Sequence, residues 1–389
     1  MSSPSPAAAP AAASARGASS RIDRFLAILP ARNGSDLHLA AGSPPILRLD
    51  GELERSRYRD LTEADYENLV RPITPPPVWQ RFLATGDVDF AYQMGQEARF
   101  RVNLFRQERG PAAVFRLIPS RVPSTEELDL PASVAALFAA ERGLVLVTGP
   151  TGSGKSTTLA AILDRVNKRL PYHVVTIEDP IEFVHTNDRS VFTQRELGED
   201  VPTFAEGVKA AIREDPDCLL VGEMRDLETM RMALTAAETG LLVFATLHTN
   251  SAAKAVDRII DAFPAAEQEQ IRTVLAEVLR AVVAQQLLRR REKGRAAAFE
   301  VLLGSTALSN AIREGKTGLI NNQIQTGKAK GMISMDQSLT ELVRSGAVAA
   351  EEALERALDK ESFKSFAASL PKEPRREPAQ PAAPPAPAR

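Results

Sequence analysis

The sequence predicts an α/β protein built from a small N-terminal α+β domain, a P-loop domain with a parallel sheet, and a helical C-terminal part. Two observations carry this prediction. After residue 131, short apolar strands alternate with helical segments, which is the pattern of a parallel sheet wound with helices. The phosphate-binding pattern G-x-x-x-x-G-K-[ST] occupies residues 149–156, directly between a buried strand and a helix.

Composition limits the classes of function. The chain has 389 residues, with 48 basic and 50 acidic side chains and a net charge of −2. Because the acidic and basic side chains nearly balance, we expect no large, uniformly positive surface that would bind nucleic acid or an anionic membrane. Cys218 is the single cysteine, so no intramolecular disulfide or Cys-rich zinc site is possible, which fits a reducing cytoplasm. No run of 18 apolar residues and no secretory signal is found, so membrane insertion is not expected.

The N-terminal part divides into a tail and a small domain. Residues 1–20 are nearly all Ala, Ser and Pro, and we expect a disordered tail there, with another at the Pro-rich residues 371–389. Residues 21–119 are expected to form the α+β domain. Apolar residues at helical spacing predict a helix at 21–29, and the capping signal Thr62-x-x-Asp65 predicts the start of a second helix. Strand-like pieces follow at 36–40, 46–49, 88–92, 98–102 and 113–118.

The second domain begins after a proline-punctuated linker at 120–131 and is expected to span 132–370. Its helices are predicted near 156–168, 204–213 and 227–239. Its strands are predicted at 143–148, 173–177, 218–221 and 241–247. After Phe263 the pattern is helical almost to the tail, with one apolar stripe running from Ile271 to Val283.

The P-loop is the candidate nucleotide-binding site. It comprises Gly149, Pro150, Thr151, Gly152, Ser153, Gly154, Lys155, Ser156 and Thr157. The glycines let main-chain N–H groups surround phosphates, and the helix that follows adds a favourable dipole. We expect Lys155 to reach the β and γ phosphates and the Ser156 hydroxyl to hold Mg²⁺. The predicted ligands are therefore ATP and Mg²⁺.

Acidic residues end two predicted strands beside this loop. Glu178 follows the strand at 173–177, and Glu223 lies two residues beyond the strand at 218–221. Ligands bind at the carboxyl ends of parallel strands in such sheets. We expect Glu223 on the metal side and Glu178 as the base that activates the attacking water. The structural alternative is that either acid only caps a helix or pairs with Arg225.

His248 directly follows the last predicted strand of this domain. From that position it could sense or hydrogen-bond the γ-phosphate. A lone histidine is weak evidence, so a structural role stays equally open.

Several motifs together resemble the GspE/PilT family of secretion ATPases, and within it the type IV pilus retraction members. These motifs are the P-loop, the acidic box at 177–185, and the segments 213–217, 221–226, 236–240 and 245–250. The similarity covers about residues 21–366, including the stretches 99–105 and 324–337. The resemblance implies a PAS-like N-terminal domain, a RecA-like ATPase domain and a homohexameric motor that hydrolyses ATP to power pilus retraction and twitching motility.

The resemblance also implies residue roles by position. Glu178 matches the family's catalytic glutamate, Glu223 its Walker B glutamate, and His248 its histidine-box residue. Arg101 and Arg116 resemble the N-terminal-domain arginines that close over the nucleotide phosphates. Cationic stabilisation of a transferring phosphoryl group agrees with that role. The alternative for both arginines is an ordinary solvated strand face.

The same resemblance implies partners and a location. The expected partner is the inner-membrane platform protein at the pilus base, which would make the chain cytoplasmic and peripheral to the inner membrane. A paralogous motor ATPase is a further candidate partner. No nucleic acid is expected, because a nucleic-acid motor would need a basic channel or stacking aromatics, and this chain has 15 Phe, 4 Tyr and 1 Trp in 389 residues.

Two alternatives within the family stay open. Pilus-extension and type II secretion ATPases usually carry a longer N-terminal region and a four-cysteine zinc insertion, which one cysteine does not allow. A paralogue that assists or modulates the main motor is suggested by Ser309, which stands in the segment 307–311 where retraction members usually read Ala-Ile-Arg-Asn-Leu. Serine cannot make an arginine's bidentate bonds to a carboxylate, unless a neighbour such as Arg313 supplies the charge.

Overall fold

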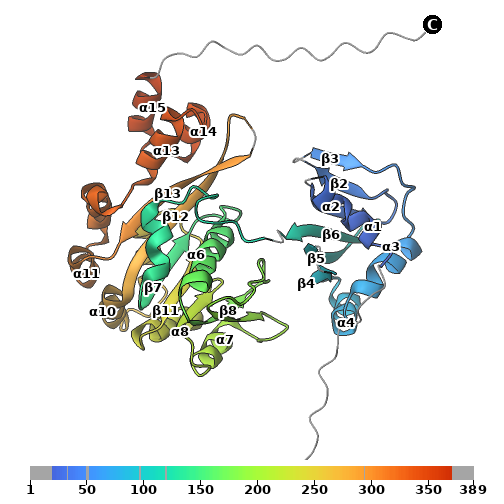
Figure 1. Cartoon of the computed structure of the whole chain (residues 1–389), viewed down its shortest axis with the longest axis horizontal. Helices are drawn as coiled ribbons and strands as arrows, with labels where there is room; N and C mark the ends of the chain where they lie inside the picture. Colours follow the sequence, from blue (N-terminus) through green and yellow to red (C-terminus); the bar gives the residue numbers. More distant parts are fainter. Residues whose placement is uncertain are drawn as a thin grey trace, which may run out of the picture.

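Two β-sheets, each with its own hydrophobic core, make up the chain (Figure 1). The computed structural model describes residues 20–369, except Asn33, Asp50, Gly51, Gln96, Glu97, Pro119, Ser120 and Lys293. The tails expected at 1–20 and 371–389 therefore lie outside the described residues, apart from Ser20. In the described part of the chain, no helix combines the length and apolar character needed to cross a membrane.

The N-terminal sheet is antiparallel and has six strands in the order β3-β2-β1-β6-β5-β4. The strands are β1 (Gly34–Ala40), β2 (Ile46–Leu49), β3 (Glu52–Arg55), β4 (Asp87–Met94), β5 (Ala98–Gln107) and β6 (Gly110–Ile118). Along β5, Phe100, Val102 and Leu104 are buried in the core, so Arg99 and Arg101 lie on the opposite face.

Helices cover the core face of this sheet. They are α1 (Asp23–Leu26), α2 (Ile28–Ala31), α3 (Glu63–Val70), the 3₁₀ helix η1 (Arg71–Ile73) and α4 (Pro76–Thr85). The predicted capping signal is confirmed, because Thr62 Oγ1 accepts a hydrogen bond from Asp65 N and Asp65 Oδ2 accepts one from Thr62 N. All five predicted strands are present. The single helix predicted at 21–29 is wrong, because α1 and α2 are two separate turns.

The second sheet has seven strands in the order β13-β12-β7-β11-β10-β8-β9. The strands are β7 (Gly143–Thr148), β8 (His173–Glu178), β9 (Val191–Glu196), β10 (Cys218–Val221), β11 (Leu242–Leu247), β12 (Leu279–Arg289) and β13 (Arg295–Leu303). Neighbouring strands are parallel except for β12 and β13. The predicted mixed α/β fold with a parallel sheet is confirmed.

Helices pack on both faces of the seven-stranded sheet. One core joins α5 (Ala132–Ala135), the 3₁₀ helix η2 (Ala136–Ala139) and α6 (Lys155–Arg169) to Val145 and Val147 of β7. The core on the other face joins Leu144 and Leu146 to α7 (Phe204–Ala211), α8 (Leu227–Glu238), α9 (Ala252–Asp261) and α10 (Gln268–Val278). Because β7 is buried on both faces, it places the P-loop at its carboxyl end in the centre of the layer structure.

The C-terminal part is helical, as predicted. It contains α11 (Thr306–Arg313), η3 (Thr317–Leu319), α12 (Ile320–Thr326), η4 (Lys328–Lys330), α13 (Met335–Arg344), α14 (Ala350–Arg356) and α15 (Lys360–Ser369). A separate core packs α13, α14 and α15 against β12 and β13. These helices lie over the end of the sheet that is far from β9 (Figure 1).

The continuous helical pattern expected after Phe263 is wrong at residues 279–303. Helix α10 ends at Val278, and the chain continues as β12 and then β13. Nearly every residue of β12 is buried, so the strand shows no alternation of apolar and polar residues. Its apolar positions therefore also fit helical spacing, and periodicity alone cannot distinguish the two structures.

Candidate nucleotide-binding site

A cavity of about 220 Å³ lies at the carboxyl ends of β8, β10 and β11, beside the P-loop. Residues from both sheets line it, namely Thr151, Gly152, Lys155, Ser156, Glu178, Asp179, Glu182, Glu223, Arg225, His248 and Arg101. The structure therefore brings together the predicted P-loop residues Lys155 and Ser156, the two predicted glutamates, the predicted histidine and one of the two predicted arginines.

The P-loop backbone takes shapes that require glycine. Gly154 has φ of 88° and is the N-cap residue of α6, a left-handed conformation that side chains disfavour. Gly149 also has positive φ, and a side chain there would collide with the main-chain oxygen of Gln285 on β12. The buried Ser153 Oγ has no hydrogen-bond partner among the described residues. The loop therefore lies at the N-terminus of α6 and lines the cavity, the position in which a phosphate-binding loop is found.

Lys155 is folded back onto the loop that it follows. Its Nζ donates to the carbonyl oxygens of Gly149, across 2.8 Å, and Pro150, across 3.1 Å. Burial lowers the pKa of Lys155, while the charges of Glu223 and Glu182 oppose that shift. The ammonium group is therefore at the mouth of the loop, held by weak acceptors that a phosphate can replace.

Glu178 ends β8 and is half-buried, with its carboxylate held by two neighbours. Oε1 accepts a hydrogen bond from Thr176 Oγ1 across 2.7 Å and from Gln194 Nε2 across 3.3 Å. Burial raises the pKa of Glu178 to about 7, against the lowering effect of these two hydrogen bonds. A carboxylate with a pKa near neutrality can accept a proton from water at physiological pH.

Glu223 lies between two basic side chains. Its Oε1 is 2.8 Å from His248 Nε2, and its Oε2 is 2.7 Å from Arg225 Nη2. Burial opposes ionisation, but the hydrogen bond from Arg225 and the nearby positive charges lower the pKa of Glu223 overall. The pairing with Arg225 that we gave as the structural alternative is therefore present, and it does not remove Glu223 from the cavity.

The residues present fit a magnesium ion that also contacts phosphates. Within the described residues, no cluster of three or more His, Cys, Asp or Glu could hold a metal ion by itself. Mg²⁺ in nucleotide sites is usually held by one or two protein oxygens plus the substrate phosphates. The Ser156 hydroxyl and the Glu223 carboxylate are donors of that type. Each Glu223 oxygen has one basic partner, Arg225 or His248, and keeps a second lone pair that could bind the metal.

The structure separates the two predicted arginines. Arg101 on β5 lines the cavity, where its Nε also lies 3.4 Å from Asp89 Oδ1. Arg116 is its cross-strand neighbour on β6, one strand further from the β4 edge of the sheet, and does not line the cavity. Arg116 Nε donates instead to Asp36 Oδ1 across 2.8 Å, while 69% of the Arg116 side chain stays exposed.

Two further groups, Gln194 and Arg225, shape the site without being predicted as site residues from the sequence. Gln194 holds Glu178 from the neighbouring strand β9, and it donates to the carbonyl oxygen of Phe183 as well. The polar sequence of β9 gave no strand pattern, so no signal pointed to Gln194. Arg225 was named only as a structural partner, although it also lines the cavity.

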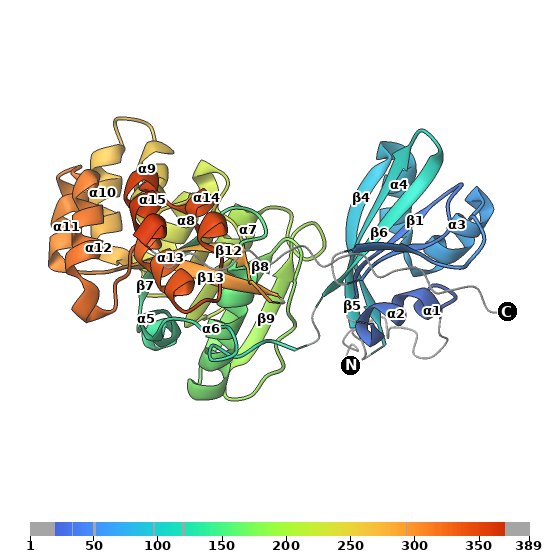
Figure 2. The same cartoon turned by 90° about the horizontal axis from the view of Figure 1, so that it is seen from above.

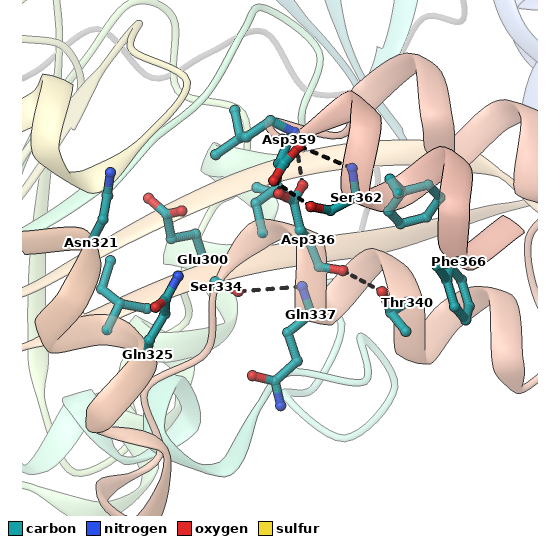
Figure 3. Close-up of a pocket in the computed structure, with 14 residues that line it drawn as sticks. Glu300, Asn321, Gln325, Ser334, Asp336, Gln337, Thr340, Asp359, Ser362 and Phe366 are labelled. Atoms are coloured by element: carbon teal, nitrogen blue, oxygen red, sulfur yellow. Dashed lines mark hydrogen bonds between the residues drawn. The ribbon is translucent and has the colours of Figure 1, made fainter.

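A second cavity, of about 560 Å³, lies among β13, α12, α13 and α15 (Figure 3). Its carboxylates are held by the main chain: Asp336 accepts hydrogen bonds from Leu358 N and Asp359 N, and Glu300 accepts one from Ala252 N. These contacts join α13 to the segment that leads into α15, and β13 to the start of α9. We therefore place the candidate catalytic chemistry in the cavity beside the P-loop.

Comparison with known proteins gives the class of the chain. The family model described as type II/IV secretion system protein matches residues 76–362. The type IV pilus retractation ATPase PilT of Pseudomonas aeruginosa is 47% identical over 342 residues, which is 88% of this chain and 99% of PilT. A twitching motility protein of Neisseria gonorrhoeae is 50% identical over 319 residues, covering 82% of this chain and 85% of that protein.

A solved structure agrees with these relatives. The crystal structure of the pilus retraction motor PilT with bound ADP superposes with a TM-score of 0.82 at 41% identity, covering 88% of this chain and 98% of that one. The chain belongs to the type II/IV secretion system protein family, and its relatives in that family include proteins named for pilus retraction and twitching motility. The resemblance to the GspE/PilT family is thereby confirmed.

Proposed function

We propose that this chain is a motor that hydrolyses ATP to ADP and phosphate and uses the energy to power type IV pilus retraction. The observation that carries the proposal is the single cavity shared by the P-loop, Glu178, Glu223, His248 and Arg101. The relatives named for pilus retraction, which match most of the chain, support the same function.

The proposed chemistry divides the reaction among these residues. Main-chain N–H groups of residues 151–157 bind the phosphates, and Lys155 leaves the carbonyls of the loop to contact the β and γ phosphates. Glu178 accepts the proton of the attacking water, which its pKa of about 7 allows. Ser156 and Glu223 would hold Mg²⁺, which would supply positive charge beside the phosphates. Arg101 stabilises the negative charge of the transferring group.

His248 has a positioning role in this proposal. Its Nε2 lies 2.8 Å from Glu223 Oε1. Because the two side chains are in contact, a movement of Glu223 when the γ-phosphate is lost would also move His248. Hydrolysis can then alter the contacts of His248 through Glu223. The histidine need not touch the phosphate itself for this role.

We further propose a division into an N-terminal PAS-like domain at 21–119, a linker at 120–131 and a RecA-like ATPase domain at 132–370, assembled as a homohexamer. The separate cores of the two sheets support that division. Between residues 121 and 131 the chain forms turns and bends without a helix or strand, as a linker would. Closure of the N-terminal domain over ATP, and opening on release, would supply the mechanical step.

The proposed partner is the inner-membrane platform protein at the pilus base, which would place the chain in the cytoplasm at the membrane surface.

A second candidate function is that of a paralogue that assists the main retraction motor, and Ser309 favours it. Ser309 Oγ donates to the carbonyl oxygen of Ala276 across 2.6 Å, which fixes α11 against α10. At position 309 the chain therefore has an uncharged side chain that contacts a neighbouring helix, where the retraction members have an arginine.

Three measurements test the proposed function. The purified full-length chain should release phosphate from ATP in the presence of Mg²⁺, and its mass in solution should be that of a hexamer. Expression in a piliated strain lacking its retraction motor should restore twitching motility. Absence of ATP hydrolysis by an assembled chain would overturn the enzymatic proposal, and hydrolysis without restored motility would favour the paralogue.

A further inference from the structure

An ion pair connects the two sheets close to the candidate site. Arg99 on β5 donates from Nη2 to Glu196 Oε2 across 3.2 Å, although 97 positions separate the two residues. Glu196 ends β9, the edge strand of the seven-stranded sheet. Figure 2 shows β9 on the side of that sheet that faces β5.

Glu196 also holds the loop that follows Glu178. The same Oε2 atom accepts a hydrogen bond from the main-chain N–H of Ile181 across 3.1 Å. Glu196 is the register partner of Glu178 across the β8–β9 pair, and Leu197 N donates to the Glu178 main-chain oxygen across 2.8 Å. One carboxylate oxygen therefore joins the N-terminal sheet to the backbone next to the proposed base.

Glu196 is buried in this contact, and Arg99 is partly buried, with 23% of its side chain exposed. Glu196 is 7% exposed, and the buried Nε of Arg99 has no hydrogen-bond partner among the described residues. Desolvating an arginine and a carboxylate is costly unless they interact with each other. Removing Arg99 would leave a buried carboxylate without its cation. This contact therefore differs from exposed ion pairs such as Arg32–Glu54, whose side chains are more than half exposed.

The position of Arg99 connects this ion pair to the nucleotide cavity. Arg99 and Arg101 are two residues apart on β5 and lie on the same face of the strand. Arg101 lines the cavity, and Arg99 contacts the edge of the sheet that forms it. Fixing Arg99 to Glu196 thus limits where Arg101 can lie.

We propose that Arg99 and Glu196 are positioning residues that fasten the N-terminal sheet to the loop after Glu178, and so hold Arg101 over the nucleotide. This inference rests on the proposed ATPase function. In this arrangement, the N-terminal sheet closes and the loop after Glu178 is placed at the same time, because both depend on the Glu196 carboxylate.

The first test measures steady-state ATP hydrolysis by the full-length chain. Arg99→Gln should lower kcat roughly 10-fold, the scale of a lost hydrogen bond between charged groups. KM should change less than about threefold, because the P-loop, which supplies ground-state binding, is untouched. Arg99→Lys keeps the cation and should recover most of the rate. The matched control is Arg32→Gln, which removes an ion pair of 3.1 Å between the end of α2 and β3 and should leave the rate unchanged.

A double-mutant cycle separates positioning from general loss of structure. On an Arg101→Ala background, adding Arg99→Gln should change kcat less than about twofold, because the side chain that Arg99 positions is already absent. Glu196→Gln should behave like Arg99→Gln in both backgrounds. If Arg99→Gln lowered kcat by the same factor with and without Arg101, the positioning role would be overturned. A kcat for Arg99→Gln equal to that of the parent would overturn it as well.

A second readout does not depend on activity. Cys218 is buried, so cysteines introduced by Arg99→Cys and Glu196→Cys can be linked selectively with a short bismaleimide. We expect a crosslink within one chain, identified by mass spectrometry, and none for the pair Arg32→Cys and Glu196→Cys. A missing Arg99–Glu196 crosslink would overturn this inference even if the chain hydrolyses ATP. If the crosslink forms but the unsubstituted chain does not hydrolyse ATP, the proposed function is overturned and, with it, the positioning role.

Discussion

Thr176 and Glu178 lie two residues apart on β8, and Thr176 Oγ1 donates to Glu178 Oε1 across 2.7 Å. Gln194 on β9 donates to the same oxygen across 3.3 Å. These two hydrogen bonds fix the orientation of a carboxylate whose pKa burial raises to about 7. The proposed base is thus oriented by neighbours on its own strand and on the adjacent strand.

This environment predicts the pH dependence of hydrolysis. A base must be ionised to accept a proton, so kcat/KM should rise with pH through a midpoint near 7. For that midpoint the rate at pH 6 should be roughly one-tenth of the plateau above pH 8. Initial rates measured from pH 5.5 to 9 test this. A flat profile between pH 5.5 and 8 would contradict the assignment of Glu178.

Lys155→Ala should abolish nucleotide binding and hydrolysis together. The substitution removes the cation that the P-loop presents to the β and γ phosphates. Binding can be followed by the fluorescence of a labelled ADP, and hydrolysis by phosphate release. Lys168→Ala is the matched control, because Lys168 lies on the same helix, is largely exposed, pairs with Asp164 across 2.7 Å and does not line the nucleotide cavity. Tight binding of labelled ADP by Lys155→Ala would show that the loop does not need this lysine.

The two arginines should differ in their effects. Arg101→Ala should lower kcat by about 10²-fold, the scale of one lost transition-state donor, because Arg101 lines the cavity. Arg116→Ala should lower it by less than about fivefold, because Arg116 is paired with Asp36 outside the cavity. Steady-state rates of both variants test this order. Equal losses for the two variants would mean that Arg116 also reaches the nucleotide.

Ser309→Arg should affect motility without affecting hydrolysis. The side chain lies at the contact of α11 with α10, away from the residues that line the nucleotide cavity. If the missing cation weakens coupling to the pilus base, Ser309→Arg should improve twitching in a strain lacking the main motor while the ATPase rate stays within about twofold. Strong twitching supported by the unmodified chain alone would rule out this explanation.

Much of the architecture could be predicted from local sequence. The P-loop lies between β7 and α6, and acids follow β8 and β10, so the topology of a parallel sheet alone predicts that they converge. The strand β12 could not be recognised, because its residues are buried on both faces and lack a period of two. The edge strand β9 could not be recognised either, because its sequence is mostly polar.

Contacts between segments that are distant in the chain could not be predicted from the sequence. Arg101 and Arg116 occupy similar strand positions, and only the three-dimensional arrangement shows that one lines the cavity and the other pairs with Asp36. The ion pair of Arg99 with Glu196 joins two sheets with separate cores. No periodicity or motif spacing encodes such a contact, because it depends on how the two sheets are placed relative to each other.

The central claim is that Glu178 is the base for ATP hydrolysis, and single-turnover hydrolysis by Glu178→Gln tests it most directly. Glutamine keeps the size of the side chain but cannot accept the proton of water, so ATP should bind with an affinity within about threefold of the parent. The hydrolysis rate of bound ATP should fall by roughly 10² to 10⁴. Hydrolysis by Glu178→Gln at near the parent rate would contradict the account.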